Sequence, residues 1–305
     1  MRLDENKELF FKYVNETSVF LDVHREYVEK DYWLVLILKN ILSKDRGYVF
    51  KGGTSLSKCY HLINRFSEDI DISYSDSYDS ISITEKNRKF KGITTSIKES
   101  GLDIANRDHL RRSAYFNRFL CPYPSLCSDR TIEKQVVVEL ASQTPSFPSI
   151  IKPLQSFIGE YLQYIGRNDL VKLYELQSFD VLVQSLSRTI VDKIYAICDY
   201  YLDGRYSKHS RHIYDIYKIL PHIVLDNSLK ELFIEVRKYR VKIQICSSAK
   251  EGVLLSSVLS SIINENVFKS DYENITYKLL YEDVKYKDCV DALKIILKFL
   301  LQSSL

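Results

Sequence analysis

The sequence lacks several features that would place it in common protein classes. Its six cysteines include no Cys-x-x-Cys pair, so no zinc site is predicted and the thiols are expected to be reduced and mostly buried. The apolar run at residues 33–38 is too short to span a bilayer, and the charged segment at residues 2–8 is unlike a secretory signal. No internal repeat or low-complexity segment is present. These absences predict a cytoplasmic location.

The chain also has little net charge. Its 43 basic and 40 acidic residues leave a net charge of +3, so any nucleic-acid-binding surface has to be local. A chain of 305 residues with 45% hydrophobic residues can bury a substantial core in one large or two modest domains.

A pair of adjacent glycines is the first informative feature that is present. Residues 48–50 are predicted to form a buried strand that stops there, and residues 55–63 a helix. Paired glycines let the backbone approach a ligand, and a helix that starts beside them directs free N–H groups at the turn. The turn alone nevertheless favours an ordinary connection without a ligand. The candidate nucleotide-binding residues are Lys51, Gly52, Gly53, Thr54, Ser55 and Lys58.

An Asp-x-Asp pair follows in an apolar, strand-like run. Asp69 and Asp71 are two residues apart, so in a strand their carboxylates lie on one face. Paired carboxylates repel each other unless a cation lies between them, and Mg²⁺ (or Mn²⁺) binds such oxygens together with those of a phosphate. A lone Asp-x-Asp is more often a solvated strand face, but the combination with the glycine turn predicts a metal and triphosphate site.

A third carboxylate is a candidate metal ligand. Residues 135–140 are predicted to form a strand because of their β-branched content, and Glu139 is the acid within them. If this strand lies beside the Asp-x-Asp strand, Glu139 completes the metal site. An edge position facing water is an equally weighted alternative.

The C-terminal part of the sequence has a helical pattern. Apolar residues recur at helical spacing through residues 178–202, and Gly204 suits the end of that helix. Lys193 lies at the border of the apolar stripe, where the pattern by itself favours a solvent-reaching lysine over one that reaches a triphosphate. Residues 210–220 predict another helix, on which Arg211 and Asp215 are spaced for a surface ion pair.

Basic and aromatic residues are interleaved in a way that suits RNA phosphates and exposed bases. Solvated helix faces in a tyrosine-rich protein are the alternative. The three clusters are Tyr201, Arg205, Tyr206, Lys208, His209, Arg211, Tyr214 and Tyr217; Arg237, Lys238, Tyr239, Arg240 and Lys242; and Arg107, Arg111, Arg112 and Arg118.

The run from Phe50 to Ile72 resembles the nucleotidyltransferase AbiEii/AbiGii toxin family of bacterial toxin–antitoxin and phage-defence systems. Residues 29–33, 188–196 and 210–217 resemble further motifs of that family. The resemblance implies NTP binding at the glycine turn, metal at Asp69 and Asp71, and a requirement for Lys193 and Asp215 in toxicity. It also implies a cognate antitoxin. The related MenT-type toxins transfer nucleotides to the 3′ end of tRNA.

These features together predict a two-lobed α+β protein. Residues 1–160 are expected to form a polymerase-β-like nucleotidyltransferase lobe with a small mixed sheet, and residues 161–305 a helical lobe that presents Lys193 and Asp215 across a cleft from the carboxylates. The expected activity is transfer of a nucleotide from an NTP to RNA, such as the 3′ end of tRNA. Transfer to a protein or small molecule, and NTP binding without catalysis, are the alternatives.

Overall fold

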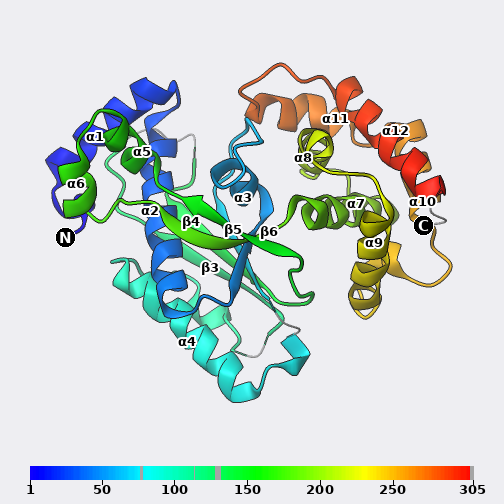
Figure 1. Ribbon diagram of the computed structural model, residues 1–305, viewed down its shortest axis with the longest axis horizontal. Helices are drawn as coiled ribbons and strands as arrows, with labels where there is room; N and C mark the ends of the chain where they lie inside the picture. The colour runs from blue at the N-terminus through cyan, green and yellow to red at the C-terminus, as the bar shows by residue number, and fades with distance from the viewer. Residues whose placement is uncertain (76–77, 113, 128–131, 303–305) are drawn as a thin grey trace. The chain divides into compact units, whose positions relative to one another are not determined.

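The computed structural model describes residues 1–75, 78–112, 114–127 and 132–302, and its backbone forms two compact units (Figure 1). The first unit comprises Met1–Cys59, Glu68–Ser142 and Ser149–Val183, and the second Tyr60–Ser67, Gln143–Pro148 and Gln184–Leu305. The chain therefore leaves the first unit and returns to it twice. The division into a nucleotidyltransferase domain (residues 1–160) and a helical domain (residues 161–305) stays a prediction.

The first unit contains a six-stranded mixed sheet in the order β3-β4-β2-β1-β6-β5, which confirms the predicted α+β class. β2 pairs antiparallel with β1 and parallel with β4, whereas β3 pairs antiparallel with β4 at one edge. The strands are β1 (Tyr48–Lys51), β2 (Asp69–Tyr74), β3 (Phe116–Pro122), β4 (Gln135–Ala141), β5 (Ser149–Leu154) and β6 (Phe179–Gln184).

The two faces of the sheet differ in character because side chains alternate along each strand. On one face Phe50, Ile72 and Leu140 stand opposite one another on neighbouring strands and are buried. Helices α2 (Arg25–Lys44) and α4 (Ile83–Glu99) cover this face in Figure 1, and Phe90 of α4 packs against Phe119 of β3 with ring centroids 5.7 Å apart. The polar residues of β2 therefore lie on the opposite face.

The remaining helices of the first unit flank the sheet. The short helix α3 (Gly52–Lys58) directly follows β1, and the others are α1 (Lys7–Leu21), α5 (Phe157–Tyr164) and α6 (Asn168–Leu173). Helix α2 is buried along most of its length, including Trp33, Leu34 and Ile37. Burial of each such side chain stabilises the fold by roughly 1.5–3 kcal/mol.

The second unit consists mainly of helices. Its helices are α7 (Leu186–Leu202), α8 (Arg211–Ile219), α9 (Asn227–Arg240), α10 (Leu255–Glu265), α11 (Lys269–Asp271) and α12 (Tyr286–Gln302), with a π-helical turn at Tyr272–Thr276. Helix α8 packs against α7 and α12, and its Ile213, Tyr214 and Ile216 are fully buried. No helix within the described ranges is both long enough and apolar enough to cross a membrane. All six cysteines are buried free thiols, as predicted.

The predicted helix over residues 178–202 is wrong in its first part. Residues Phe179–Gln184 form β6, in which Val181 and Val183 are buried at strand spacing, and α7 begins only at Leu186. The Ser185 side chain accepts a hydrogen bond from the Arg188 N–H, which fixes the start of α7. A short apolar run fits the spacing of a strand as well as that of a helix, so the periodicity of the sequence could not reveal this boundary.

The helix predicted for residues 55–63 also ends earlier than expected. Helix α3 already begins at Gly52 rather than at residue 55, and it stops at Lys58, so Tyr60 and Ile63 lie beyond it. The segment Tyr60–Ser67 belongs to the second unit, where Arg65 forms an isolated bridge with Leu280 and the Phe66 N–H donates to the Leu279 carbonyl at 3.2 Å. Long-range pairing therefore overrides the local helical pattern.

Candidate functional site

Asp69 and Asp71 lie on the polar face of β2, as the alternation predicted. Both side chains are half-buried, whereas Ile70 and Ile72 between and beyond them are fully buried on the opposite face. The apolar residues anchor the strand, and the carboxylates remain within reach of a ligand. Asp71 stands opposite Lys51 of β1, so a lysine of the glycine motif and a carboxylate of the Asp-x-Asp motif are cross-strand neighbours.

Gly52 forms a cradle for the Asp71 carboxylate. It has a φ of +77°, which L-residues rarely adopt, and it is the first residue of α3. A Cβ atom placed on Gly52 would lie 1.9 Å from Asp71 Oδ2, a distance at which the two atoms would overlap. The first glycine of the motif is therefore required on two grounds: the backbone conformation and the close approach of Asp71.

Glu139 lies beside Asp71, so the structure meets the condition on which its candidacy as a metal ligand depended. The two residues stand opposite each other on the parallel strands β2 and β4. On its other side Glu139 faces Arg118 of β3, whose Nε lies 3.4 Å from Glu139 Oε1. Among residues 1–75, 78–112, 114–127 and 132–302, no three His, Cys, Asp or Glu side chains converge as a metal-binding group. The role of Glu139 as a metal ligand stays a prediction.

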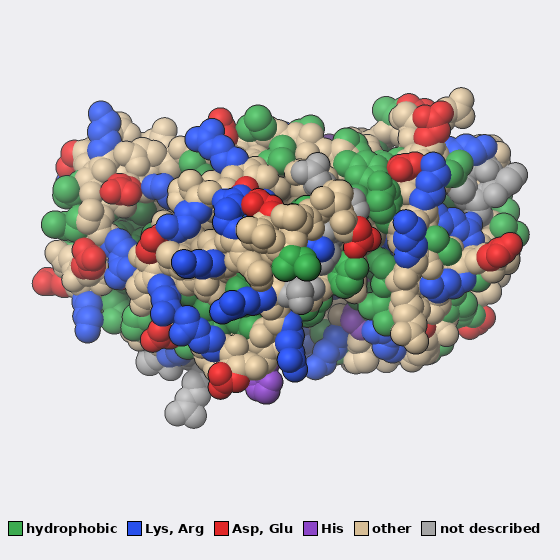
Figure 2. All heavy atoms as spheres, turned by 90° about the horizontal axis from the view of Figure 1, so that it is seen from below, with side chains coloured by type: hydrophobic (Ala, Val, Ile, Leu, Met, Phe, Trp, Pro, Cys, Tyr) green, Lys and Arg blue, Asp and Glu red, His purple; other side chains and the backbone are tan. Residues whose placement is uncertain are grey.

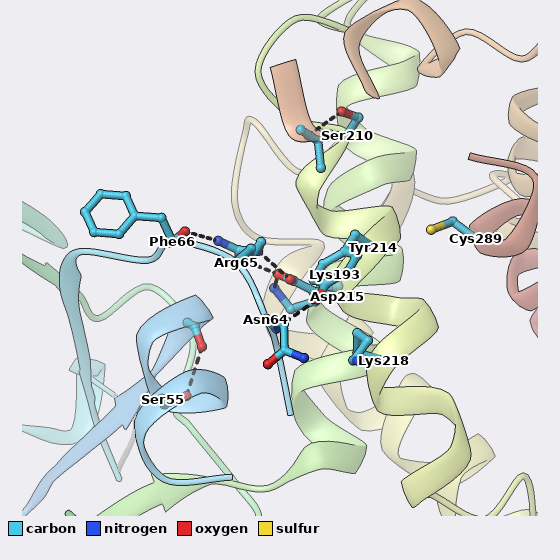
Figure 3. A network of polar contacts seen from close by, with 12 residues as sticks. Ser55, Asn64, Arg65, Phe66, Lys193, Ser210, Tyr214, Asp215, Lys218 and Cys289 are labelled. Atoms are coloured by element: carbon cyan, nitrogen blue, oxygen red, sulfur yellow. Dashed lines mark hydrogen bonds and ion pairs between the residues drawn. The ribbon is translucent and has the colours of Figure 1, made fainter. Parts of the chain in front are cut away.

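The hydroxyl and lysine side chains of α3 have internal contacts. Thr54 and Ser55 are buried, and Ser55 Oγ donates to the Gly52 carbonyl oxygen at 2.9 Å (Figure 3). Lys58 is also buried, with Nζ 2.9 Å from Asp31 Oδ1 and 3.6 Å from the centre of the Phe157 ring. The proposed nucleotide-binding roles of Lys51, Gly53 and these residues stay predictions.

Buried charges on α2 hold both motifs in place, and sequence reasoning assigned them no role. Lys30 Nζ contacts Glu68, the residue before Asp69, and donates to the Glu133 carbonyl oxygen at 3.1 Å. Asp31 holds Lys58 at the end of α3 and accepts the Phe157 N–H at 2.7 Å. Charged residues that are buried need partners of opposite charge, so the adjacent Lys30 and Asp31 in an apolar helix could have indicated such contacts.

In the second unit, Lys193 and Asp215 meet in a buried cluster with Arg65 (Figure 3). Arg65 donates through Nε to Asp215 Oδ1 and through Nη2 to Oδ2, each at 2.8 Å, and Lys193 Nζ lies 2.6 Å from Oδ2. Asp215 is fully buried, and Lys193 is 6% exposed. The cluster thus carries two cations and one anion away from water.

The charges of this cluster shift its pKa values in defined directions. Burial alone would raise the pKa of Asp215, but Arg65 and Lys193 outweigh burial and hold that pKa below its ordinary value. Burial lowers the pKa of Lys193; Asp215 opposes this effect and Arg65 adds to it. Burial, Lys193 and Arg211 also keep the pKa of nearby His212 well below its ordinary value, so His212 is neutral at pH 7.

Two interpretations based on pattern alone are therefore wrong. Lys193 is not a solvent-reaching lysine, because its ammonium is buried against Asp215. Asp215 does not form a surface pair with Arg211, which is exposed; it is buried, and its guanidinium partner is Arg65. Arg65 and Asp215 are 150 residues apart in the sequence, so helical spacing could not reveal the pair.

The basic and aromatic clusters separate into engaged and exposed members. Arg237 donates to the carbonyl oxygens of Lys250 and Val253, each at 2.7 Å, and Arg240 pairs with Asp199 at 2.6 Å, so both serve the fold. Tyr214 is buried and donates to Glu282. In the third cluster, by contrast, the residues on and before β3 are exposed: Arg107, Arg111, Arg112 and Arg118.

Comparisons with solved structures show which proteins share the fold of this chain. A fold search matches the nucleotidyltransferase toxin MenT4 from Mycobacterium tuberculosis, with 18% identity and a TM-score of 0.58 over 90% of this chain and 82% of that one. It also matches a protein from H. pylori described as a nucleotidyltransferase, with 15% identity and a TM-score of 0.50 over 92% and 96% of the two chains. These matches show a shared fold. No curated protein matches the sequence.

A family model supplies the assignment. The model of the nucleotidyl transferase AbiEii toxin of type IV toxin–antitoxin systems matches residues 37–292, which include the glycine turn, both acidic strands and the buried cluster. The chain belongs to this family of nucleotidyltransferase toxins.

Proposed function

We propose that this toxin transfers a nucleotidyl group from an NTP to an RNA acceptor, such as the 3′ end of a tRNA. The observation that carries the proposal is the arrangement of Asp69, Asp71 and Gly52, in which two carboxylates share one strand face and one lies in a glycine cradle. Such a pair is suited to hold a divalent cation between protein and phosphate oxygens.

The residues present fit a divalent cation in an NTP-dependent enzyme. Asp69 and Asp71 would hold the ion, with Glu139 beside Asp71, and the Gly52 cradle keeps one carboxylate in place. When bound, Mg²⁺ or Mn²⁺ would neutralise phosphate charge and favour the deprotonated acceptor. The acceptor oxygen forms a bond to the α-phosphorus while the bond to pyrophosphate breaks, and the hydroxyl proton passes to water. Lys193 and Asp215 are proposed to be required for this reaction.

Transfer to a protein or small molecule, and NTP binding without transfer, remain the competing functions. Membership of a type IV family implies a cognate antitoxin. We propose that the toxin acts in the cytoplasm, where NTPs and tRNA are available, and that it contributes to phage defence.

The decisive experiment uses the full chain with each α-³²P-labelled NTP, Mg²⁺ and total RNA. We expect label at the RNA 3′ end, and no label on RNA whose 3′ diol has been oxidised. Asp71→Ala should abolish transfer while its melting temperature stays close to that of the wild type, because removal of one of two neighbouring carboxylates relieves repulsion. The matched control is Asp180→Ala, an exposed aspartate on β6 of the same sheet.

Label on protein instead of RNA would support the second function, and NTP binding without any labelled product would support the third. If Asp71→Ala melts far below the wild type yet still transfers nucleotide, the assignment of metal to this carboxylate is wrong.

A further inference from the structure

A row of charged side chains crosses the polar face of the sheet from the glycine motif to the sheet edge. From β1 across β2 and β4 to β3, each strand contributes one charged residue to this row, and each residue stands opposite the next: Lys51, Asp71, Glu139 and Arg118. Two strand spacings of about 4.8 Å place the Arg118 backbone roughly 10 Å from that of Asp71. The face that carries the candidate catalytic carboxylates therefore continues to the outer edge of the first unit.

The edge strand β3 exposes an aromatic and a basic side chain on that same face. Phe116 is 47% exposed and the Arg118 side chain 54% exposed, while Asn117, Phe119 and Cys121 alternate with them and are buried. A solvent-exposed phenylalanine on an edge strand promotes aggregation, so natural edges usually avoid it. Its presence beside an arginine, next to the carboxylates, points to a ligand.

Arg118 is only weakly engaged within the protein. Its Nε lies 3.4 Å from Glu139 Oε1, a longer contact than the 2.8 Å at which Arg167 pairs with Asp169. A half-exposed ion pair of this kind contributes little stability, so Arg118 can bind another anion at small cost.

The segment that precedes β3 carries more basic than acidic side chains. Arg107, Arg111 and Arg112 are exposed in the segment before β3, and Asp108 is the acidic residue among them. Lys and Arg side chains also gather on the face shown in Figure 2, over α4, but this helix covers the apolar face of the sheet and is not part of the surface beside Arg118. The exposed arginines before β3 therefore supply the positive charge for a polyanion.

We propose that Phe116 and Arg118 form a strip on β3 that binds the single-stranded end of the acceptor RNA in the transfer reaction. A base near the RNA end stacks on Phe116, a backbone phosphate pairs with Arg118, and the terminal hydroxyl is thereby directed along the sheet face toward Asp69 and Asp71. This inference rests on the proposed function and adds the surface that the acceptor occupies.

Single-stranded RNA fits this surface better than the other polyanions. Stacking on an aromatic ring requires an unpaired base, so a duplex cannot use Phe116. An acidic peptide would pair with the arginines but gains little from a flat ring beside them. The strip is thus expected to bind RNA ends that are unpaired.

The test measures binding and transfer separately with the full chain. A fluorescent 12-nucleotide single-stranded RNA is titrated without NTP into the wild type and into Phe116→Leu, Phe116→Trp and Arg118→Ala. Phe116→Leu should weaken binding by about tenfold because it removes the stacking surface, whereas Phe116→Trp should retain binding. Arg118→Ala should weaken binding and reduce the slope of log K against log salt by about 0.7, the value for one phosphate contact on a single strand.

Matched controls come from elsewhere in the first unit. Ile151→Ala alters an exposed apolar residue on β5 at the opposite edge of the sheet, and Arg167→Ala removes an exposed, ion-paired arginine. Both should bind RNA like the wild type. In transfer assays, Phe116→Leu and Arg118→Ala should raise KM for the RNA with KM for the NTP unchanged.

The outcomes separate the strip from the proposed function. If RNA is labelled normally by Phe116→Leu and Arg118→Ala, the strip is wrong while the transfer reaction stands. If no RNA is ever labelled but binding depends on Phe116 as described, the strip stands and the reaction does not. Equal binding of duplex RNA, or competition by poly-glutamate as strong as that by RNA, overturns the strip in favour of another polyanion.

Discussion

The carboxylate of Asp71 lies directly against the α-carbon of Gly52, so closely that a methyl group on Gly52 would fall 1.9 Å from Asp71 Oδ2. The glycine turn and the Asp-x-Asp strand are thus one interlocked unit. A change at either residue must alter the other.

Gly52→Ala is therefore expected to abolish nucleotide transfer. The methyl group must displace the Asp71 carboxylate, and a misplacement of about 1 Å at a reacting centre costs on the order of a hundredfold in rate. The matched control is Gly166→Ala, because Gly166 has the same φ of +77° but nothing within 4 Å of its added Cβ. Both variants carry a backbone strain of about 1–2 kcal/mol. Equal transfer rates for the two variants would show that the contact with Asp71 has no catalytic consequence.

Asp215→Asn is expected to destabilise the second unit and to alter its response to acid. The change leaves Arg65 and Lys193 buried without their anion, a loss of about 3–5 kcal/mol at pH 7. In the folded protein the pKa of Asp215 lies below its ordinary value of 3.8. The ionised carboxylate therefore stabilises the fold above pH 3.8, and this stabilisation is lost as the pH falls from 3.8 toward the folded pKa. The free energy of unfolding measured with urea should decrease below about pH 4 in the wild type, and this decrease should be smaller in the variant.

The control for this experiment is Asp169→Asn, since Asp169 forms an exposed pair with Arg167. Screening by water makes such a pair nearly neutral for stability. If Asp215→Asn unfolds at the same urea concentration as the control, the buried cluster does not stabilise the fold.

Lys193→Ala is expected to reduce transfer on the order of a hundredfold with a melting temperature close to that of the wild type. The fold should tolerate the change because Arg65 still donates two hydrogen bonds to Asp215. Lys193→Arg should not fully restore activity, because a planar guanidinium group on a longer arm replaces the compact ammonium group. Lys218→Ala is the control: this lysine of α8 pairs with Glu282 at 2.9 Å. Full toxicity of Lys193→Ala in a growth assay would remove Lys193 from the reaction.

Lys30→Met is expected to impair transfer indirectly. Lys30 holds Glu68, so its loss frees the residue that precedes Asp69 and shifts the carboxylate. We expect a higher Mg²⁺ concentration for half-maximal activity and partial recovery in Lys30→Arg, which a purely destabilising change would not show. Lys44→Met is the control, because Lys44 is on the same helix but pairs at the surface with Glu99. Unchanged Mg²⁺ dependence in Lys30→Met would mean that the contact has no positioning role.

The local part of the site could be predicted from the sequence. A strand that stops at glycine and an alternating acidic strand are signalled by neighbouring residues, whereas the pairing that brings Glu139 beside Asp71 was left open. The buried cluster could not be predicted in the same way. The partners of Asp215 come from residues 65 and 193, and no local period encodes such a contact. The adjacent charges Lys30 and Asp31 in an otherwise apolar helix indicated buried partners, but the sequence did not show which residues those partners are.

The path of the chain through its two units has a practical consequence for dissection of the protein. Residues Tyr60–Ser67 connect α3 to β2, yet they belong to the second unit, where Arg65 binds Asp215. A fragment that ends near Val183 would keep Asp69, Asp71 and Glu139 but would lose Lys193 and Asp215, and it would leave Arg65 without its binding partner. Chains truncated near Val183 should therefore not be toxic. A protease cut within Tyr60–Ser67 should inactivate the protein without yielding a stably folded fragment.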